Sequence, residues 1–344
     1  MPTWGKLLEE IQQAKKDKKP PPFDAMRRRY LVDLHDYTKR AVILYATKWT
    51  QADPNIPLEM VSINDEDLQG LMEVLNGVDI DQLDLIIHSP GGSVDAAEAI
   101  VHYLRSKFSH IRVFVPQLAM SAATMIACAA DEIVMGKHSF IGPTDPQLIL
   151  TTGTGTRMVA AASILEQFDK AVEECKEPGK LGAWLPMLGQ YGPDLLVKCE
   201  HVCDLAETLV KEWLAAYMMK NEGDPTAKSG EIASWLSDHK HFRTHARHIA
   251  RSEAEERGLR IVRLEDDQKL QDLVLSAYHA TTHTFNFTGA VKIIENHLGR
   301  AFINAVQVTP AAPVMPPIMV QIPHGQRPPA TTPAKPIGPP PVDA

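Results

Sequence analysis

The stretch PQLAMSAATMIACAADEI (116–133) places one hydroxyl, Ser121, among residues that are almost all small or apolar. The serine falls where a strand-like half of the stretch gives way to a helix-like half. Its hydroxyl could cap that helix or, with a base to take its proton, act as a nucleophile. The small residues Ala119, Ala122 and Ala123 favour the nucleophile, because they let a substrate backbone approach closely.

A second motif with chemical potential, IIHSPGGSVDAAEAI, lies one strand earlier. Pro90 fixes a backbone φ, and the Gly91–Gly92 pair permits a sharp turn that leaves backbone N–H groups pointing outward. The N–H groups of Gly92 and Ala122 could together hold a developing oxyanion. Two turns and one serine therefore predict an acyl-transfer site.

A serine hydroxyl needs a nearby base at neutral pH, and sequence spacing does not identify one. Lys211 is one candidate, because apolar neighbours in its helix (Leu209, Val210, Trp213 and Leu214) could lower its pKa by desolvation. His241, His245 and His248 have the spacing of a metal-binding helix face, but no HExxH motif accompanies them, and we expect no metal. The other candidates are His138 and Asp145.

Composition restricts the class of protein. The chain has 344 residues, 44% of them hydrophobic and 23% charged, and a net charge of -8, which argues against a nucleic-acid binder. Its four cysteines include no CxxC pair, so we expect a reducing, cytoplasmic location and packing rather than metal binding at Cys199 and Cys203.

Polar residues interrupt the longest apolar stretch, 113–130, so we expect no transmembrane segment. We expect no signal peptide at the N-terminus.

The pattern along the chain predicts an α/β fold. Apolar runs at 41–46, 83–89, 111–116 and 132–136 have the character of buried strands and alternate with helical segments, which predicts a parallel sheet covered on both faces. We expect a basic N-terminal arm over 1–30, a domain over 31–306 with a helical insertion at about 151–240, and a disordered tail over 307–344. Twelve of the 26 prolines fall in that tail from Val308 onward, and it could dock a partner.

The motifs SPGGSVDAAEAI and PQLAMSAATMIACAADEIVMGKHSFIGPTDPQ resemble the Clp-protease/crotonase superfamily, and more closely the serine dehydrogenase proteinase family. That family is related to signal peptide peptidase A and the NfeD-type peptidases. The likeness runs from WGKLLEEIQQ to VKIIENHLGRAFI. It implies a Clp protease/crotonase-like fold, Ser121 as nucleophile, and Gly92 and Ala122 as the oxyanion hole.

The resemblance offers two bases. ETLVKEWLAAYM is similar to the helix that supplies a lysine in signal peptide peptidase A, with Lys211 at the matching place. Where the Clp subunit has its catalytic histidine, this chain has Gly142 to Asp145. His245 falls close to the position of the Clp aspartate, so a rewired Ser121–His245 pair is the second assignment.

We therefore expect a serine endopeptidase that cleaves proteins or peptides, without a cofactor, and assembles as a homo-oligomer. Gly91, Ser93 and Val94 would hold the substrate backbone as an added strand. Some relatives carry an N-terminal membrane helix, which this sequence does not show. The rivals are a catalytically silent scaffold, in which Ser121 is only a cap, and a crotonase-like acyl-CoA enzyme that does not need Ser121.

Overall fold

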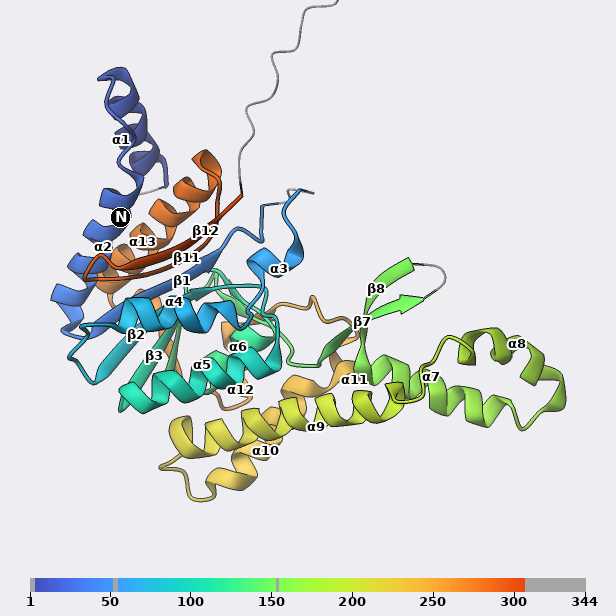
Figure 1. Ribbon diagram of the computed structural model, residues 1–344. Coiled ribbons are helices and arrows are strands. Elements are labelled where there is room, and N and C mark those ends of the chain that lie inside the picture. Colours follow the sequence, from blue (N-terminus) through green and yellow to red (C-terminus); the bar gives the residue numbers. More distant parts are fainter. Residues whose placement is uncertain (1–3, 52–54, 153–154, 307–344) are drawn as a thin grey trace, which may run out of the picture. The chain divides into compact units, whose positions relative to one another are not determined.

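The computed structural model describes residues 4–51, 55–152 and 155–306. Its centre is a seven-stranded sheet in the order β10-β5-β3-β2-β1-β11-β12 (Figure 1). Val, Ile and Leu dominate the central strands because both faces of the sheet are covered. The strands are β1 (Ala41–Thr47), β2 (Gln82–His88), β3 (His110–Val115), β5 (Glu132–Met135), β10 (Ile261–Arg263), β11 (Ala290–Asn296) and β12 (Ala301–Ala305).

The sheet is parallel from β10 to β1. The strands predicted from apolar runs correspond to β1, β2, β3 and β5, so the α/β class is confirmed. These four strands are parallel, as expected, whereas two further strands at one edge are not: β11 runs antiparallel to β1 and β12 antiparallel to β11. A short turn with Gly299 at φ 81° joins these last two strands, a connection that only antiparallel neighbours permit.

Helices cover the sheet on two sides. Because side chains alternate along a strand, Ile43 and Tyr45 face one helical layer and Val42 and Leu44 face the other. The first layer contains α4 (Glu66–Leu75), α5 (Val94–Lys107), α6 (Ala122–Cys128) and α9 (Leu195–Trp213). The second contains α2 (Phe23–Thr38) and α13 (Gln268–Phe287). In the N-terminal arm, α1 (Trp4–Lys16) packs against α13.

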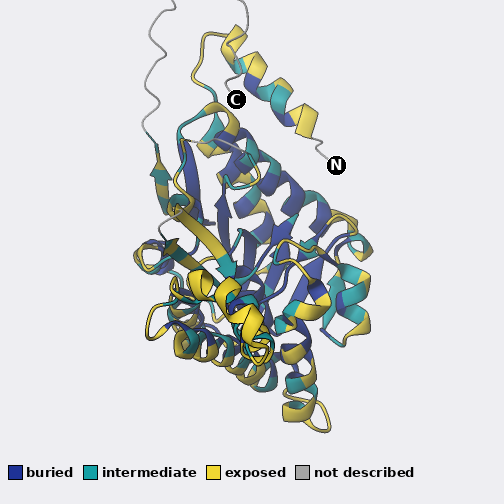
Figure 2. Ribbon diagram, turned by 90° about the vertical axis from the view of Figure 1, so that its right-hand side faces the viewer, coloured by how far each residue is buried: buried dark blue, intermediate teal, exposed yellow. Residues whose placement is uncertain are grey.

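The region expected as a helical insertion begins with a hairpin, β7 (Gln147–Thr152) and β8 (Gly155–Ala160). The expectation of helix from about residue 151 is wrong for this hairpin, because the first helix of the region begins only at Ala161. Helix α8 has no buried residue, whereas the central sheet is dark blue in Figure 2. The helical elements of this region are α7 (Ala161–Glu174), α8 (Pro178–Leu188), α9, the π-helix η1 (Leu214–Met218) and α10 (Pro225–Ser237).

A small three-stranded sheet in the order β4-β6-β9 lies beside the main one. Its strands are β4 (Leu118–Ala119), β6 (Phe140–Ile141) and β9 (Ile249–Ala250). The remaining elements are short: α3 (Leu58–Val61), α11 (His239–Phe242), α12 (Arg251–Glu256) and the 3-10 helix η2 (Leu264–Asp266).

Two expectations concern the ends of the chain and membranes. The proline-rich segment 307–344 lies outside the described residues. None of the helices in the described ranges combines the length and the apolar character that a membrane crossing requires.

Candidate active site

Ser121 occupies a strained turn between β4 and α6. Its backbone has φ 52° and ψ -121°, a left-handed conformation that costs a residue with a side chain about 1–3 kcal/mol. Its hydroxyl caps no helix N–H and makes no hydrogen bond in the described part of the chain. The helix-cap interpretation therefore lacks its hydrogen bond, and the strain matches the exposed nucleophile turns that connect a strand to a helix.

Thr124, one turn into α6, holds this turn in place. Its buried hydroxyl donates to the Ala119 carbonyl at 2.8 Å and accepts from the Gly142 N–H at 3.0 Å. Helix α6 is thus tied to both β4 and β6, and the position of Ser121 between them is fixed. Every residue of α6 is buried, so the turn rests on a closely packed layer.

The Gly91–Gly92 loop packs directly against Ser121. A Cβ on Gly91 would lie 2.7 Å from the Ser121 Cβ and 2.8 Å from the Ala122 nitrogen, and Gly91 has φ +93°. A Cβ on Gly92 would lie 2.2 Å from the Ile63 carbonyl oxygen. Only glycine fits either position, because the backbone approaches closely on both sides of the loop.

The backbone register determines where the N–H groups of this loop point. The Ile63 N–H donates to the Gly91 carbonyl at 2.7 Å, and the Ser93 N–H donates to the Ile63 carbonyl at 3.0 Å. Because N–H and C=O groups alternate in direction along an extended segment, those of Gly92 point away from Ile63. Within the described ranges the Gly92 N–H makes no hydrogen bond, nor does that of Ala122, the first residue of α6. Two unpaired donors therefore lie beside Ser121.

The small sheet brings further polar side chains to the same edge. Strands β4 and β6 are parallel and β9 is antiparallel to them, so the segments after Ala119 and Ile141 and the segment before Ile249 share one edge. There the His245 Nδ1 lies 2.7 Å from an oxygen of the buried Asp145 carboxylate. The sequence indicated His245 and Asp145 as candidate site residues but did not predict that they contact each other.

Asp145 also binds a second histidine that sequence analysis missed. The His239 Nδ1 lies 2.8 Å from the other oxygen of Asp145, and the His239 Nε2 lies 2.8 Å from the Ser163 hydroxyl. These residues come from α11 and α7, more than seventy positions apart in the chain. No local motif marks the contact, so only the three-dimensional structure reveals it.

Lys211 lies on the exposed side of α9. The structure buries Leu209, Val210 and Leu214 against the core and half-buries Trp213, but the Lys211 side chain itself is exposed, so these neighbours do not desolvate it. A Cβ on Gly230 of α10 would lie 3.8 Å from the Lys211 Cε. Across the described residues, Lys211 forms no ion pair or hydrogen bond with Ser121 or Asp145.

The remaining histidines do not form a helical metal face. Helix α11 ends at Phe242, so His245 and His248 lie in the connection to β9; His248 stacks on Phe140 at 5.3 Å between ring centroids. His138 is exposed beside Gly136. Over the ranges that the structure describes, no group of three or more His, Cys, Asp or Glu side chains is arranged to hold a metal ion.

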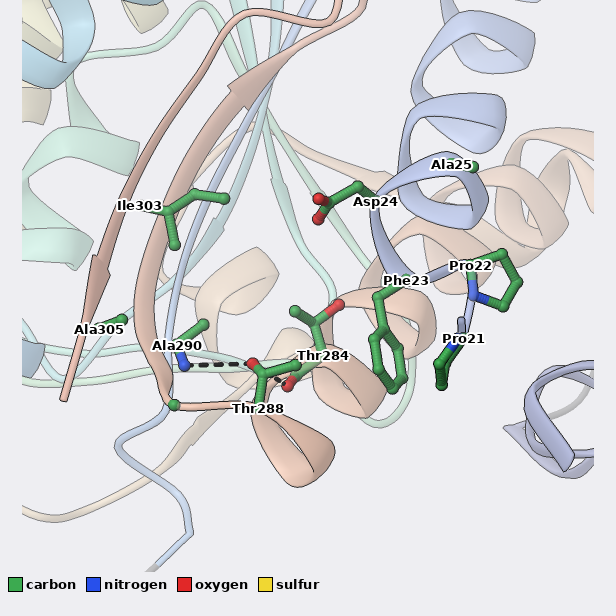
Figure 3. Close-up of a pocket in the computed structure, with 11 residues that line it drawn as sticks. Pro21, Pro22, Phe23, Asp24, Ala25, Thr284, Thr288, Ala290, Ile303 and Ala305 are labelled. Atoms are coloured by element: carbon green, nitrogen blue, oxygen red, sulfur yellow. Dashed lines mark hydrogen bonds between the residues drawn. The ribbon is translucent and has the colours of Figure 1, made fainter. Parts of the chain in front are cut away.

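One hollow of about 400 Å³ lies elsewhere, between the α1–α2 connection, the end of α13 and β12 (Figure 3). Phe23, Thr284 and Ile303 line it, with Asp24 as the charged group. None of the residues around Ser121 contributes to it, so the candidate active site and this hollow are separate features of the surface.

The fold and the site define an α/β protein with a serine on a strand-to-helix turn. Residues 55–179 match the family described as ClpP-like SDH-type serine proteinase. The predicted resemblance to that family is confirmed over this segment, which includes Gly92, Ser121, Ala122 and Asp145. The matched segment is shorter than the predicted likeness and ends before either candidate base, Lys211 or His245.

Two uncharacterized proteins of Methanocaldococcus jannaschii, MJ0137 and MJ1495, are similar to part of the chain. They are 44% identical over 84 residues and 40% identical over 95 residues. These alignments span 24% and 28% of this chain but only 29% and 30% of the relatives. The shared part is thus less than a third of either relative.

Solved protease structures are similar at a lower level. A mutant of the 1510-N membrane-bound stomatin-specific protease aligns over 62% of this chain and 79% of its own, with 14% identity and a TM-score of 0.35. A mutant of ClpP1 from Listeria monocytogenes aligns over 70% of this chain and 96% of its own, with 12% identity and a TM-score of 0.35. Similarity at this level does not extend the function of either protein to this chain.

Proposed function

We propose that the protein is a serine peptidase with Ser121 as its nucleophile. One observation carries the proposal: within the described residues, Ser121 on its strand-to-helix turn makes no side-chain hydrogen bond, and the N–H groups of Gly92 and Ala122 in the adjoining backbone are also unpaired. The match of residues 55–179 to a serine proteinase family supports the same chemistry.

Each part of this arrangement has a role in acyl transfer. The Ser121 oxygen attacks the substrate carbonyl carbon while its proton passes to a base, and the resulting oxyanion accepts hydrogen bonds from Gly92 and Ala122. Collapse of the tetrahedral intermediate breaks the C–N bond, and the leaving amine takes the proton. Water then hydrolyses the Ser121 ester and regenerates the hydroxyl.

For the base, contacts favour His245 over Lys211, the reverse of the preference drawn from sequence. Asp145 accepts from the His245 Nδ1–H, which leaves Nε2 able to take a proton, the division of labour found in Ser-His-Asp triads. The side chain of His245 is 24% exposed and that of Asp145 2%, so the imidazole is accessible and its partner is not. Lys211 remains the alternative base.

The free side of Gly92 also suggests how a peptide binds. Its C=O points away from Ile63, so an extended substrate could donate a backbone hydrogen bond to it while the Gly92 N–H serves the oxyanion, a form of pairing that tolerates many sequences. The Ser93 hydroxyl already accepts from the Ala96 N–H and caps α5, which begins at Val94. We therefore assign Gly91, Ser93 and Val94 to shaping this edge for a protein or peptide substrate.

The test is digestion of an unstructured peptide library, with products identified by mass spectrometry, for the wild type and for Ser121→Ala, His245→Gln and Lys211→Ala. We expect cleavage by the wild type and by Lys211→Ala, and silence from the other two. Silence of Lys211→Ala with an active His245→Gln would restore the lysine assignment. Equal products from wild type and Ser121→Ala would refute the proposal, whereas an inert wild type that binds CoA would favour the acyl-CoA rival.

We also propose that the protein acts as a homo-oligomer in the cytoplasm. The insertion exposes large apolar side chains, which mark interaction surfaces when they gather. They include Ile149, Met158, Leu185 and Val197. Light scattering after size exclusion would test this: a monomer at micromolar concentration contradicts the proposal. Docking through the proline-rich tail remains a prediction.

A further inference from the structure

Beneath the Gly91–Gly92 loop lies a buried polar cluster that the peptidase chemistry does not use. Lys292 on β11 and Asp67 on α4 are both fully buried, and the Lys292 Nζ lies 2.6 Å from an Asp67 oxygen. The other Asp67 oxygen accepts from the Tyr45 hydroxyl at 2.7 Å. Burying two charged side chains costs desolvation free energy that burying a hydrophobic pair would not cost. Packing alone therefore does not explain why the cluster is present.

The cluster forms hydrogen bonds with the backbone on both sides of Ile63. The Lys292 Nζ donates to the Ser62 carbonyl at 2.8 Å, and the Asn64 N–H donates to Asp67 at 2.9 Å. The residue between these two contacts, Ile63, is the one that pairs with the Gly91–Gly92 loop. The polar cluster therefore contacts the residue before and the residue after Ile63, the residue that pairs with the loop.

Ile63 in turn fixes the orientation of the Gly91–Gly92 peptide. In a trans peptide the carbonyl of one residue and the N–H of the next point in opposite directions. Because the Gly91 carbonyl accepts from the Ile63 N–H, the Gly92 N–H must point away from Ile63, on the side of the loop where Ser121 lies. Rotation of this peptide would replace an oxyanion donor by a carbonyl oxygen, and two glycines alone offer little resistance to rotation.

We propose that Lys292, Asp67 and Tyr45 are positioning residues that hold the oxyanion hole in its donor orientation, by locking residues 62–64 against the Gly91–Gly92 loop. The inference rests on the proposed serine peptidase function. None of the three side chains touches substrate, and their effect passes through Ile63.

The decisive variant is Lys292→Met, and the chain offers a matched control in Arg27→Met. Arg27 is fully buried and forms an ion pair with Glu295 on the same strand, β11, but α2 brings it to the opposite side of the sheet. Both variants remove a buried cation, whereas only Lys292→Met reaches the loop. Tyr45→Phe removes one hydrogen bond to Asp67 and serves as the milder variant should Lys292→Met not fold.

Steady-state kinetics are measured per active site, with sites counted by fluorophosphonate titration so that unfolded protein does not contribute. Loss of one oxyanion donor lowers kcat about 10²- to 10³-fold, so we expect a drop of that size in Lys292→Met with KM changed less than about threefold. Tyr45→Phe should show a smaller drop, of about tenfold. Arg27→Met should keep the wild-type kcat. Unchanged kcat in Lys292→Met, or in Tyr45→Phe where Lys292→Met does not fold, would overturn the inference.

Hydrogen exchange of the Ile63 and Ser93 amides separates this inference from the proposed function, because it requires no activity. Both amides donate hydrogen bonds across the loop contact. We expect them to exchange at least about tenfold faster in Lys292→Met, or in Tyr45→Phe, and at the wild-type rate in Arg27→Met. A wild type that neither cleaves peptides nor reacts with the fluorophosphonate refutes the peptidase function. Unchanged exchange of the Ile63 and Ser93 amides in Lys292→Met and Tyr45→Phe refutes the positioning role of the polar cluster.

Discussion

Gly91→Ala, paired with Gly77→Ala, tests whether the contact between the glycine loop and the serine turn matters for chemistry. The two glycines have similar backbones, with φ +93° at Gly91 and φ +83° at Gly77. A Cβ on Gly77 has nothing within 4 Å, whereas one on Gly91 meets the Met120 carbonyl at 2.5 Å and the Ser121 Cβ at 2.7 Å. The pair separates backbone strain from steric displacement.

Strain alone predicts the same loss of stability in both variants. An L-residue in the left-handed region costs about 1–2 kcal/mol, so the unfolding free energy of Gly77→Ala should fall by that amount with activity unchanged. Gly91→Ala should lose more stability. Because neither the Met120 carbonyl nor the Ala122 nitrogen can bend away as a flexible side chain would, the serine turn must move. A displacement of about 1 Å at a reacting group lowers the rate about 100-fold.

The assay is kcat/KM on a peptide that the wild type cleaves, together with the rate of Ser121 acylation by a fluorophosphonate and urea unfolding of all three proteins. We expect Gly91→Ala to lose at least about 100-fold in both rates and Gly77→Ala to lose less than about threefold. Wild-type rates in Gly91→Ala would refute the reasoning, as would equal losses in the two variants, since strain would then account for both.

Further predictions concern the base, a buried histidine and a buried thiol. Asp145→Asn removes the carboxylate that orients His245, so kcat should fall about 10⁴-fold with KM little changed; retention of more than a tenth of the activity would exclude this role. Burial lowers the pKa of His88 from 6.5 to about 3, so below pH 6.5 the unfolded chain takes up a proton that the folded chain does not. The unfolding free energy should therefore drop by about 2 kcal/mol from this residue between pH 7 and pH 5, and urea titrations of His88→Gln should lack that part of the drop. Burial raises the pKa of Cys128 to about 12, so iodoacetamide at pH 8 should leave it unmodified in the native protein while Cys175 reacts, as peptide mass spectrometry would show; native labelling of Cys128 would contradict its burial.

The parts of the structure that could be predicted are those with a local signal. Apolar runs located β1 to β3 and β5, and the Gly-Gly and serine motifs located two turns that the structure brings into contact. Each turn follows a strand, and the general rule that sites lie at the carboxyl ends of strands placed them together; in the structure the isolated parallel bridge between Ser89 and Ala119 brings the end of β2 next to β4.

Other parts depend on contacts between distant segments. The region from about residue 151 was expected to be helical, but pairing with β7 makes residues 155–160 a strand, because a hairpin partner outweighs intrinsic propensity. Lys211 was expected to be desolvated by its neighbours, but the helix buries Leu209, Val210 and Leu214 in the core and leaves the lysine exposed. Lys292 lies in the run AVKIIEN, whose pattern indicates a strand but gives no partner for the lysine. That partner, the Asp67 carboxylate, lies in α4 and is evident only from the three-dimensional structure.

The position of β11 between β1 and β12 has a consequence for synthesis. During translation Ser121, both glycines and Asp67 leave the ribosome well before Lys292, which arrives on one of the last strands to join the sheet. Until then β1 is an exposed edge, and the loop beside the serine lacks its buried cation. On the proposed scheme a nascent or prematurely terminated chain carries the nucleophile without a competent oxyanion hole. If the proposed peptidase function holds, this topology delays an active site until the domain is complete.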